Sequence, residues 1–207
     1  MDNYNALITA EDFFMQEKYK EAKRIYESII DKIDDCDALH TYGLCLVRLK
    51  EYDRAIEIFL KIINTDQNLG DVWYSLGRTY LIIDDFENAI RALHCAEGCV
   101  SNDSDVHFYL GMCFEKVGQF SQAIESYQKA LSLCDSVEVH INISFCYFYS
   151  GNQQLALRHI KTAFEMDPDN LECLCYLVYF LIKLKKGKKH MICCLHLTWI
   201  LIKTVQY

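Results

Sequence analysis

Apolar positions along this chain follow the period of an α-helix. In "WYSLGRTY" and "HFYLGMCF" bulky residues stand at the first, fourth and eighth places, a spacing that puts them on one helix face. A second helical segment such as "FENAIRALHCAE" follows, in which an alanine precedes a bulky residue by four places. The single proline and eight glycines of the chain suit long helices rather than many turns. The pattern predicts an all-α protein made of helix pairs.

The helix pair repeats along the chain. A small residue in the first helix of a pair lets the second helix approach closely, and an alanine in the second helix does the same in return. The small residues are Gly43, Gly77, Gly111 and Ser144, and the alanines, 33 or 34 residues apart, are Ala22, Ala55, Ala89, Ala123 and Ala156. Neither helix pair can bury its apolar face alone, so neighbouring pairs are expected to stack into a superhelix.

These segments resemble the tetratricopeptide repeat family, whose unit is two antiparallel helices. The resemblance implies a right-handed superhelix, an α-solenoid. We expect five repeats over residues 3–170, a final packing helix at 171–184, and a basic, then apolar tail at 185–207; the repeats are 3–35, 36–69, 70–103, 104–136 and 137–170. The first repeat departs from the pattern, with Thr9 and Ala10 in place of the Leu-Gly pair, and only the fifth keeps the terminal proline, Pro168.

Aromatic and cysteine residues at core spacing are interpreted as packing residues. Trp73, Leu76 and Tyr80 lie on the apolar face of a helix, and are not a cofactor box. The cysteines stand mostly at apolar helical places, such as Cys45, Cys113 and Cys146. Their number, eleven, is odd, and the opening "MDNYNALITAEDFF" lacks the basic and apolar regions of a secretory signal. We therefore expect free thiols and a cytoplasmic protein.

The net charge of −8 is unevenly distributed. Residues 171–207 hold six of the 21 basic residues and one of the 29 acidic residues, which leaves 15 basic and 28 acidic residues in the remainder. An acidic body binds phosphates poorly, so no nucleic-acid partner is expected for residues 1–170.

The resemblance implies a concave groove lined by the first helix of each pair. The expected lining is mainly aromatic and apolar and includes one arginine. Its residues are Tyr74, Arg78, Phe108, Met112, Ile141, Phe145, Phe148 and Tyr179. Of these, Phe108, Phe145, Phe148 and Tyr74 are the expected anchors. An exposed apolar lining usually marks a binding site. The tail or a second copy of the chain, in a homodimer, are alternative occupants of the groove.

Carboxylates recur at the second position of the units, and the expected site includes Asp71, Asp105 and Glu138. Two interpretations remain open, helix capping and a ladder of ligand contacts. The set of Lys, Asn and Arg with which some members of the family hold acidic chaperone tails is missing at the corresponding positions. We therefore expect a protein partner that presents an apolar or aromatic peptide or helix flanked by basic residues.

The sequence contains no phosphate-binding glycine loop, nucleophile elbow or metalloprotease helix, so no enzyme and no cofactor are expected. "HMICCLH" at 190–196 holds two His and two Cys, but Cys193 and Cys194 are adjacent and point to different sides of a helix. No metal site is therefore expected. The chain is interpreted as an adaptor or assembly subunit, similar to the arrays of the mitotic ubiquitin-ligase complex or of ciliary transport complexes. A chaperone-like holder of a hydrophobic segment is the alternative.

Three interpretations of the tail remain open. It resembles the C-terminal span of membrane-fission adaptors, yet the apolar run 191–202 covers only about 18 Å of a ~30 Å bilayer core. A tail-anchored membrane receptor is thus one alternative. The others are a segment that packs on the last helix or in the groove, and a chain end produced by alternative splicing or a gene-model error.

Overall fold

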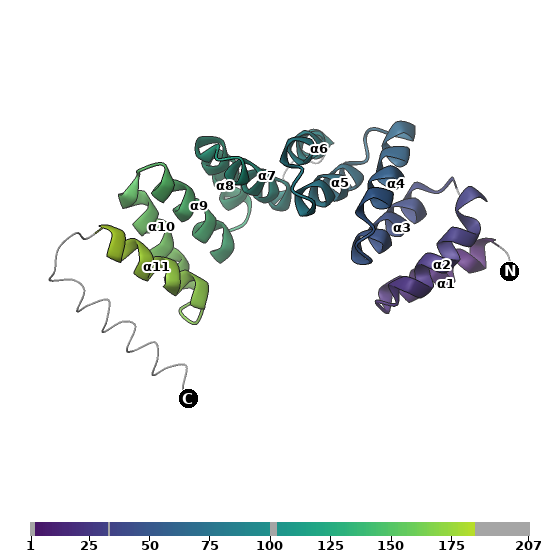
Figure 1. Cartoon of the computed structure of the whole chain (residues 1–207), viewed down its shortest axis with the longest axis horizontal. Helices are drawn as coiled ribbons and strands as arrows, with labels where there is room; N and C mark the ends of the chain where they lie inside the picture. The colour runs from purple at the N-terminus through teal and green to yellow at the C-terminus, as the bar shows by residue number, and fades with distance from the viewer. Residues whose placement is uncertain (1–2, 33, 100–102, 185–207) are drawn as a thin grey trace, which may run out of the picture. The chain divides into compact units, whose positions relative to one another are not determined.

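The computed structural model describes residues 3–32, 34–99 and 103–184, and all regular structure in these ranges is helical (Figure 1). The all-α prediction is confirmed. The predictions for the tail, 185–207, lie outside the described residues. The α-helices are α1 (Asn3–Met15), α2 (Tyr19–Ile29), α3 (Cys36–Arg48), α4 (Tyr52–Thr65), α5 (Gly70–Ile82), α6 (Phe86–Cys99), α7 (Ser104–Lys116), α8 (Phe120–Leu133), α9 (Val137–Tyr149), α10 (Gln153–Met166) and α11 (Leu171–Leu184), with one 3₁₀ turn, Ile30–Lys32, after α2.

The chain divides into two compact units, Met1–Cys113 and Phe114–Tyr207. We call the odd-numbered helices A helices and the even-numbered ones B helices. In the first unit, α1 packs on α2, α3 on α4 and α5 on α6, and α2 and α4 also contact the next A helix. In the second unit, α8 packs on α9, α9 on α10 and α10 on α11. Each unit therefore has a core between successive helices.

The core contains the residues that the apolar period selects. The five alanines at the 33- or 34-residue interval, from Ala22 to Ala156, are all fully buried. Leu76 is 1% exposed, and Trp73 and Tyr80 pack against the same cluster of the first unit. The packing interpretation of these three residues is therefore confirmed.

The small residues of the A helices touch the B helices directly. A Cβ atom added to Gly43 would lie 2.4 Å from Cε1 of Phe59, a fully buried ring on α4. A Cβ atom added to Gly77 would lie 2.7 Å from Cγ of Leu93 on α6. Real carbon contacts are not this short, so in these two pairs the helices meet at a separation that only glycine permits.

One residue in each turn from an A helix to its B helix has a left-handed backbone. Its φ is positive at Glu17, Lys50, Asp84, Gly118 and Gly151, again 33 or 34 residues apart. Around Gly151, the Gly151 N–H donates to the Phe148 carbonyl, and the next N–H donates to the Tyr147 carbonyl. The same two bonds close the other four turns. This arrangement satisfies the last carbonyls of each A helix and reverses the chain.

The nine cysteines in the described ranges are free thiols. Cys45, Cys113 and Cys146 are fully buried, as the sequence predicts. Burial raises the pKa of the Cys45 thiol to about 11 and that of Cys113 to about 12. These side chains are therefore protonated, apolar packing residues at neutral pH.

We expect Gly43→Ala to lower the free energy of unfolding by about 1–3 kcal/mol, because the added methyl group must displace the buried Phe59 ring. Chemical denaturation followed by circular dichroism measures this. Gly98→Ala is the matched control, since a Cβ at Gly98 meets nothing within 4 Å and alanine favours helix by up to about 1 kcal/mol. Equal effects of the two substitutions would contradict the steric explanation.

We expect Gly151→Ala to destabilise the chain by about 1 kcal/mol, because a left-handed backbone is unfavourable for an L-residue. Asp84→Gly is the opposite exchange at the equivalent turn, and it should leave the stability unchanged or raise it slightly. Denaturation midpoints of both variants test the comparison. A loss of stability in Asp84→Gly similar to that in Gly151→Ala would show that the side chains, not the backbone, decide these positions.

Candidate functional site

Two groups of aromatic side chains lie on the A helices, one in each unit. The first aromatic group comprises Tyr74 on α5 with Phe108 and Tyr109 on α7. The second aromatic group comprises Phe145, Phe148 and Tyr149 on α9 with Tyr176 and Tyr179 on α11. The apolar period explains neither group fully, because most of these rings are only half-buried and Tyr149 and Tyr179 are 51% and 38% exposed.

Arg78 contacts both tyrosines of the first aromatic group. Its Cζ atom lies 5.5 Å from the centroid of the Tyr74 ring and 4.9 Å from that of Tyr109. The two rings meet edge to face at 5.7 Å, and Phe108 meets Tyr109 in the same way at 5.4 Å. Cation–π contacts of this kind hold a guanidinium against an aromatic surface. The predicted residues Tyr74, Arg78 and Phe108 thus form part of one cluster.

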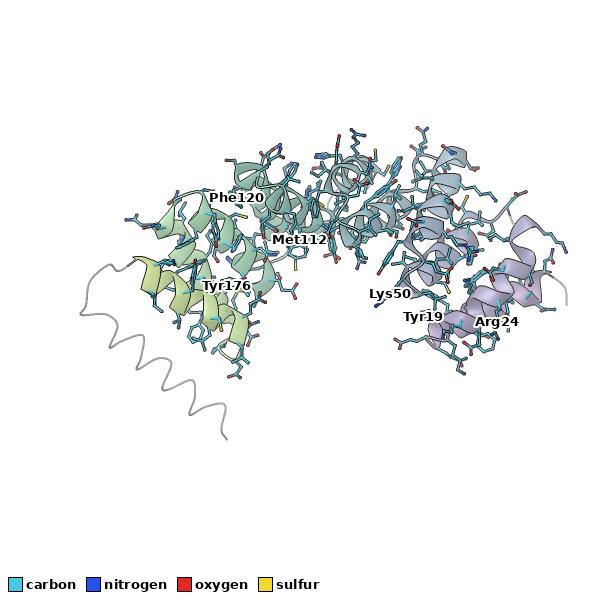
Figure 2. The ribbon with its side chains drawn as sticks, viewed as in Figure 1. Tyr19, Arg24, Lys50, Met112, Phe120 and Tyr176 are labelled. Carbon is cyan, nitrogen blue, oxygen red and sulfur yellow. The ribbon has the colours of Figure 1, made fainter. Side chains whose placement is uncertain are left out.

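Asp105 lies at the edge of the first aromatic group. The Tyr74 hydroxyl donates to Oδ2 of Asp105 over 3.5 Å, a long hydrogen bond. Burial raises the pKa of Tyr74, so its hydroxyl is protonated at neutral pH. Met112, which Figure 2 labels on α7, is half-buried. The surface here combines aromatic faces, one cation and one carboxylate.

The second aromatic group is larger and more exposed. The Phe148 ring stacks on Phe180 at 4.5 Å with an angle of 8° between the planes. Phe145 meets Tyr149 at 4.3 Å and Tyr176, labelled on α11 in Figure 2, at 6.3 Å. A hydrogen bond with Tyr179 raises the pKa of Tyr149. The group is therefore an ordered apolar surface with hydroxyl groups at its exposed side.

Basic and aliphatic side chains border the second aromatic group on α11. The ammonium group of Lys183 lies 5.6 Å from the centroid of the Tyr179 ring. Ile182 is 56% exposed. The exposed apolar surface of α11 therefore includes Ile182 as well as the tyrosines.

The predicted lining residue Ile141 belongs to the core. It is 4% exposed and packs in a cluster with Ala156 and Ile160 of α10 and with Leu177 of α11. A ligand does not reach it, because two helices cover this side of α9. Sequence reasoning also left Tyr109, Tyr149 and Tyr176 out of the site. Tyr109 and Tyr149 each lie one residue after a predicted lining position, on a neighbouring part of the helix surface. This position is the only feature of the sequence that could have indicated that they belong to the site.

The recurrent carboxylates lie in the first turn of their helices, where the helix dipole favours negative charge. Asp71, Asp105 and Glu138 are all exposed. In α3 and α7 the side-chain capping bonds come from neighbouring residues instead, and the N-caps of α5 and α9 make no side-chain capping bond. Oδ1 of Asp35 accepts from the Asp37 N–H at 2.9 Å, and Oδ1 of Asp103 accepts from the Asp105 N–H at 2.8 Å. The dipole interpretation is therefore supported, and the carboxylates remain open to solvent.

A cavity of about 270 Å³ lies at the N-terminal ends of α3 and α5. Asp37, Asp71 and His40 line it together with Cys36, Asn68, Leu69, Gly70 and Val72. Nε2 of His40 is 2.8 Å from Oγ of Ser75, and burial lowers the pKa of His40 although Asp71 and Asp37 oppose this. At neutral pH the cavity therefore presents two carboxylates beside a neutral imidazole.

Residues 3–32, 34–99 and 103–184 contain no group of three or more His, Cys, Asp or Glu side chains placed to hold a metal ion. The "HMICCLH" segment lies outside these ranges. No helix in the described part of the chain has the length and apolar character that crossing a bilayer requires. The apolar run 191–202 is likewise outside the described residues.

Two family models match the chain. One, described as anaphase-promoting complex, cyclosome, subunit 3, matches residues 15–96, and one described as tetratricopeptide repeat matches residues 104–136. BBSome complex member BBS4 from Bos taurus is 24% identical over 173 residues, 83% of this chain and 33% of that protein. Intraflagellar transport protein 88 homolog from Homo sapiens is 26% identical, over 60% of this chain and 16% of that protein. The chain thus spans a third or less of the length of these relatives.

Solved structures of similar fold are covered over nearly their whole length. MamA from Desulfovibrio magneticus RS-1 superimposes with a TM-score of 0.76 at 21% identity, covering 83% of this chain and 98% of that one. YrrB, described as a TPR protein with an unusual peptide-binding site, gives a TM-score of 0.74 at 21% identity, covering 84% of this chain and 91% of that one. These likenesses show the fold. Together with the family models and the recurring helix pairs, they establish that the chain belongs to the tetratricopeptide repeat family.

Proposed function

We propose that the chain is a non-catalytic protein-binding module, an adaptor or assembly subunit, which holds an apolar or aromatic segment of a partner protein on its A helices. The observation that carries this proposal is the second aromatic group. Its tyrosines Tyr149 and Tyr179 are 51% and 38% exposed, although the neighbouring Phe180 is fully buried. Aromatic side chains of this kind supply most of the affinity at protein interfaces.

The aromatic side chains are held in fixed positions, which supports a role in binding a partner. Phe148 is held by stacking on the fully buried Phe180, and Arg78 is held against two tyrosines. A surface that is already ordered loses little conformational entropy when a ligand arrives. The aromatic residues would therefore act as preformed contacts for a peptide or a helix.

Charge supports basic residues beside the apolar ones in the partner. Asp71 and Asp105 lie exposed in the first turns of the helices that carry Tyr74 and Phe108. In the second unit, Glu138 and Glu172 lie exposed in the first turns of α9 and α11, which carry the second aromatic group. Complementary charges mainly steer association and select the register of the ligand. A nucleic-acid partner would be repelled by the same carboxylates, and the proposed location is the cytoplasm.

Names of the relatives agree with a role in assemblies. One is a member of the BBSome complex, and one family model describes a subunit of the anaphase-promoting complex. The second candidate is a chaperone-like holder of a hydrophobic segment, which the exposed, largely uncharged surface of Tyr149, Tyr179 and Ile182 favours. The two candidates differ in ligand lifetime, since a holder must release its segment.

We expect Tyr149→Ser/Tyr179→Ser to weaken binding by about tenfold or more, because both side chains would lie in the contact. Random peptides of about 12 residues, long enough for three turns of helix, are selected on the full chain by display and provide the ligands. Fluorescence anisotropy gives each Kd. We expect the selected peptides to combine apolar or aromatic residues with Lys or Arg.

Leu133→Ser is the matched control, because Leu133 is 40% exposed on a B helix of the same unit. It should leave the Kd unchanged. Circular dichroism checks that every variant folds. Failure to select any peptide, or equal affinity for the double variant and wild type, would reject this surface as the binding site.

We expect Glu138→Gln/Glu172→Gln, in the first turns of α9 and α11, to weaken binding of the basic peptides a few-fold at about 50 mM salt and much less at about 500 mM, because exposed charges are screened. Asp53→Asn/Glu57→Gln removes the same charge from α4, a B helix, and is the control. An effect of equal size in both variants would assign the attraction to net charge rather than to the A-helix carboxylates.

A further inference from the structure

Two histidines join α9 to α10 through a single hydrogen bond. Nδ1 of His140 lies 2.9 Å from Nδ1 of His159, and the ring centroids are 5.1 Å apart. On its other side, Nε2 of His140 lies 3.0 Å from Oδ1 of Asp135, in the segment before α9. These contacts form a chain from Asp135 through His140 to His159.

The contact between the histidines restricts the number of protons that the pair holds. A carboxylate only accepts, so Nε2 of His140 carries a hydrogen. Of the two Nδ1 atoms, one must then donate and the other must accept. Either His159 donates to a neutral His140, or a charged His140 donates to a neutral His159. With both rings charged, two N–H groups and two positive charges would face each other at 2.9 Å.

The surroundings give the second charge little relief. The His140 side chain is 10% exposed. The carboxylate of Asp135, whose side chain is 68% exposed, contacts the ring of His140. His159 stacks on Tyr147 of α9 at 5.5 Å, and the Tyr147 hydroxyl accepts from the neutral side chain of Gln128 on α8. The charged group beside His159 on α10 is Arg158, also a cation.

We infer that the His140–His159 pair is an acid-sensitive link between α9 and α10, which holds the helix pair together while at most one ring is charged and loosens it when both are. The packed rings, the single shared proton and the adjacent arginine carry this inference. Burial first, then His140 and Arg158, lower the pKa of His159 from 6.5 to about 4, in agreement with it.

The sign of the pH dependence follows from proton uptake. Between about pH 6.5 and 4 the unfolded chain binds a proton at residue 159 that the folded chain does not. The contribution of His159 to stability is therefore fully present above the pKa of the unfolded residue. It falls as the pH decreases from there toward the lower pKa of the folded residue.

Thermal unfolding of the full chain and of His159→Gln at about pH 7.5 and about pH 5.0, on either side of the unfolded pKa, tests the link. We expect the midpoint of the wild-type chain to fall by about 4 °C more than that of the variant, whose amide does not titrate. The acid sensitivity of His40 is common to both proteins and cancels. His94→Gln, at an exposed position on α6, is the control and should keep the wild-type pH dependence.

An equal fall in wild type and His159→Gln would overturn the inference. If that variant does not fold, a ring-nitrogen NMR titration of the wild-type chain decides the question alone. We expect one histidine of the pair to stay neutral well below about pH 6 and to keep a hydrogen-bonded Nδ1. Protonation of both rings while the pH is still above about 6, with loss of the hydrogen-bonded Nδ1, would show that the two rings do not share a proton. Neither measurement needs a ligand, so the result is independent of the proposed function.

Discussion

The close approach of the two helices in a pair is the constraint on which the rest of the structure depends. Gly43 lies against Phe59, and Gly77 lies against Leu93, at separations that exclude any Cβ atom. The fully buried alanines on the B helices provide the complementary small surface. Because these contacts fix each B helix on its A helix, they also decide which side of the A helix is left for other contacts. The aromatic groups occupy that remaining side.

The turns make the same geometry possible in the backbone. A left-handed residue ends each of the first five A helices, although three of the five, Glu17, Lys50 and Asp84, are not glycine. An L-residue in this conformation carries a local energetic cost. Packing of the two helices on either side offsets that cost, so tertiary contacts, rather than local preference, determine these turns.

The sequence predicts the helix pairs of this fold but not the backbone of the turns between them. Helix pairs and buried alanines follow from spacing, because small residues at a fixed interval indicate repeated close contact between helices. The left-handed turns do not, since Lys50 and Asp84 resemble any solvent-exposed residue. Site residues are harder still. Ile141 and Phe145 lie one helical turn apart, yet the first is covered by α10 and α11 and the second is half-buried. The spacing of apolar residues within one helix does not show which of its positions the other helices cover.

The buried cysteines have a consequence for following the opening of this chain. Cys45 lies in the core of the first unit and Cys146 in that of the second, and burial raises the pKa of both thiols. Alkylating reagents attack thiolates, so neither residue reacts until its surroundings open. Cys95 and Cys175, which are exposed, react without such opening. The rates at which the buried thiols are modified therefore report local unfolding separately for each unit, with no label added to the chain.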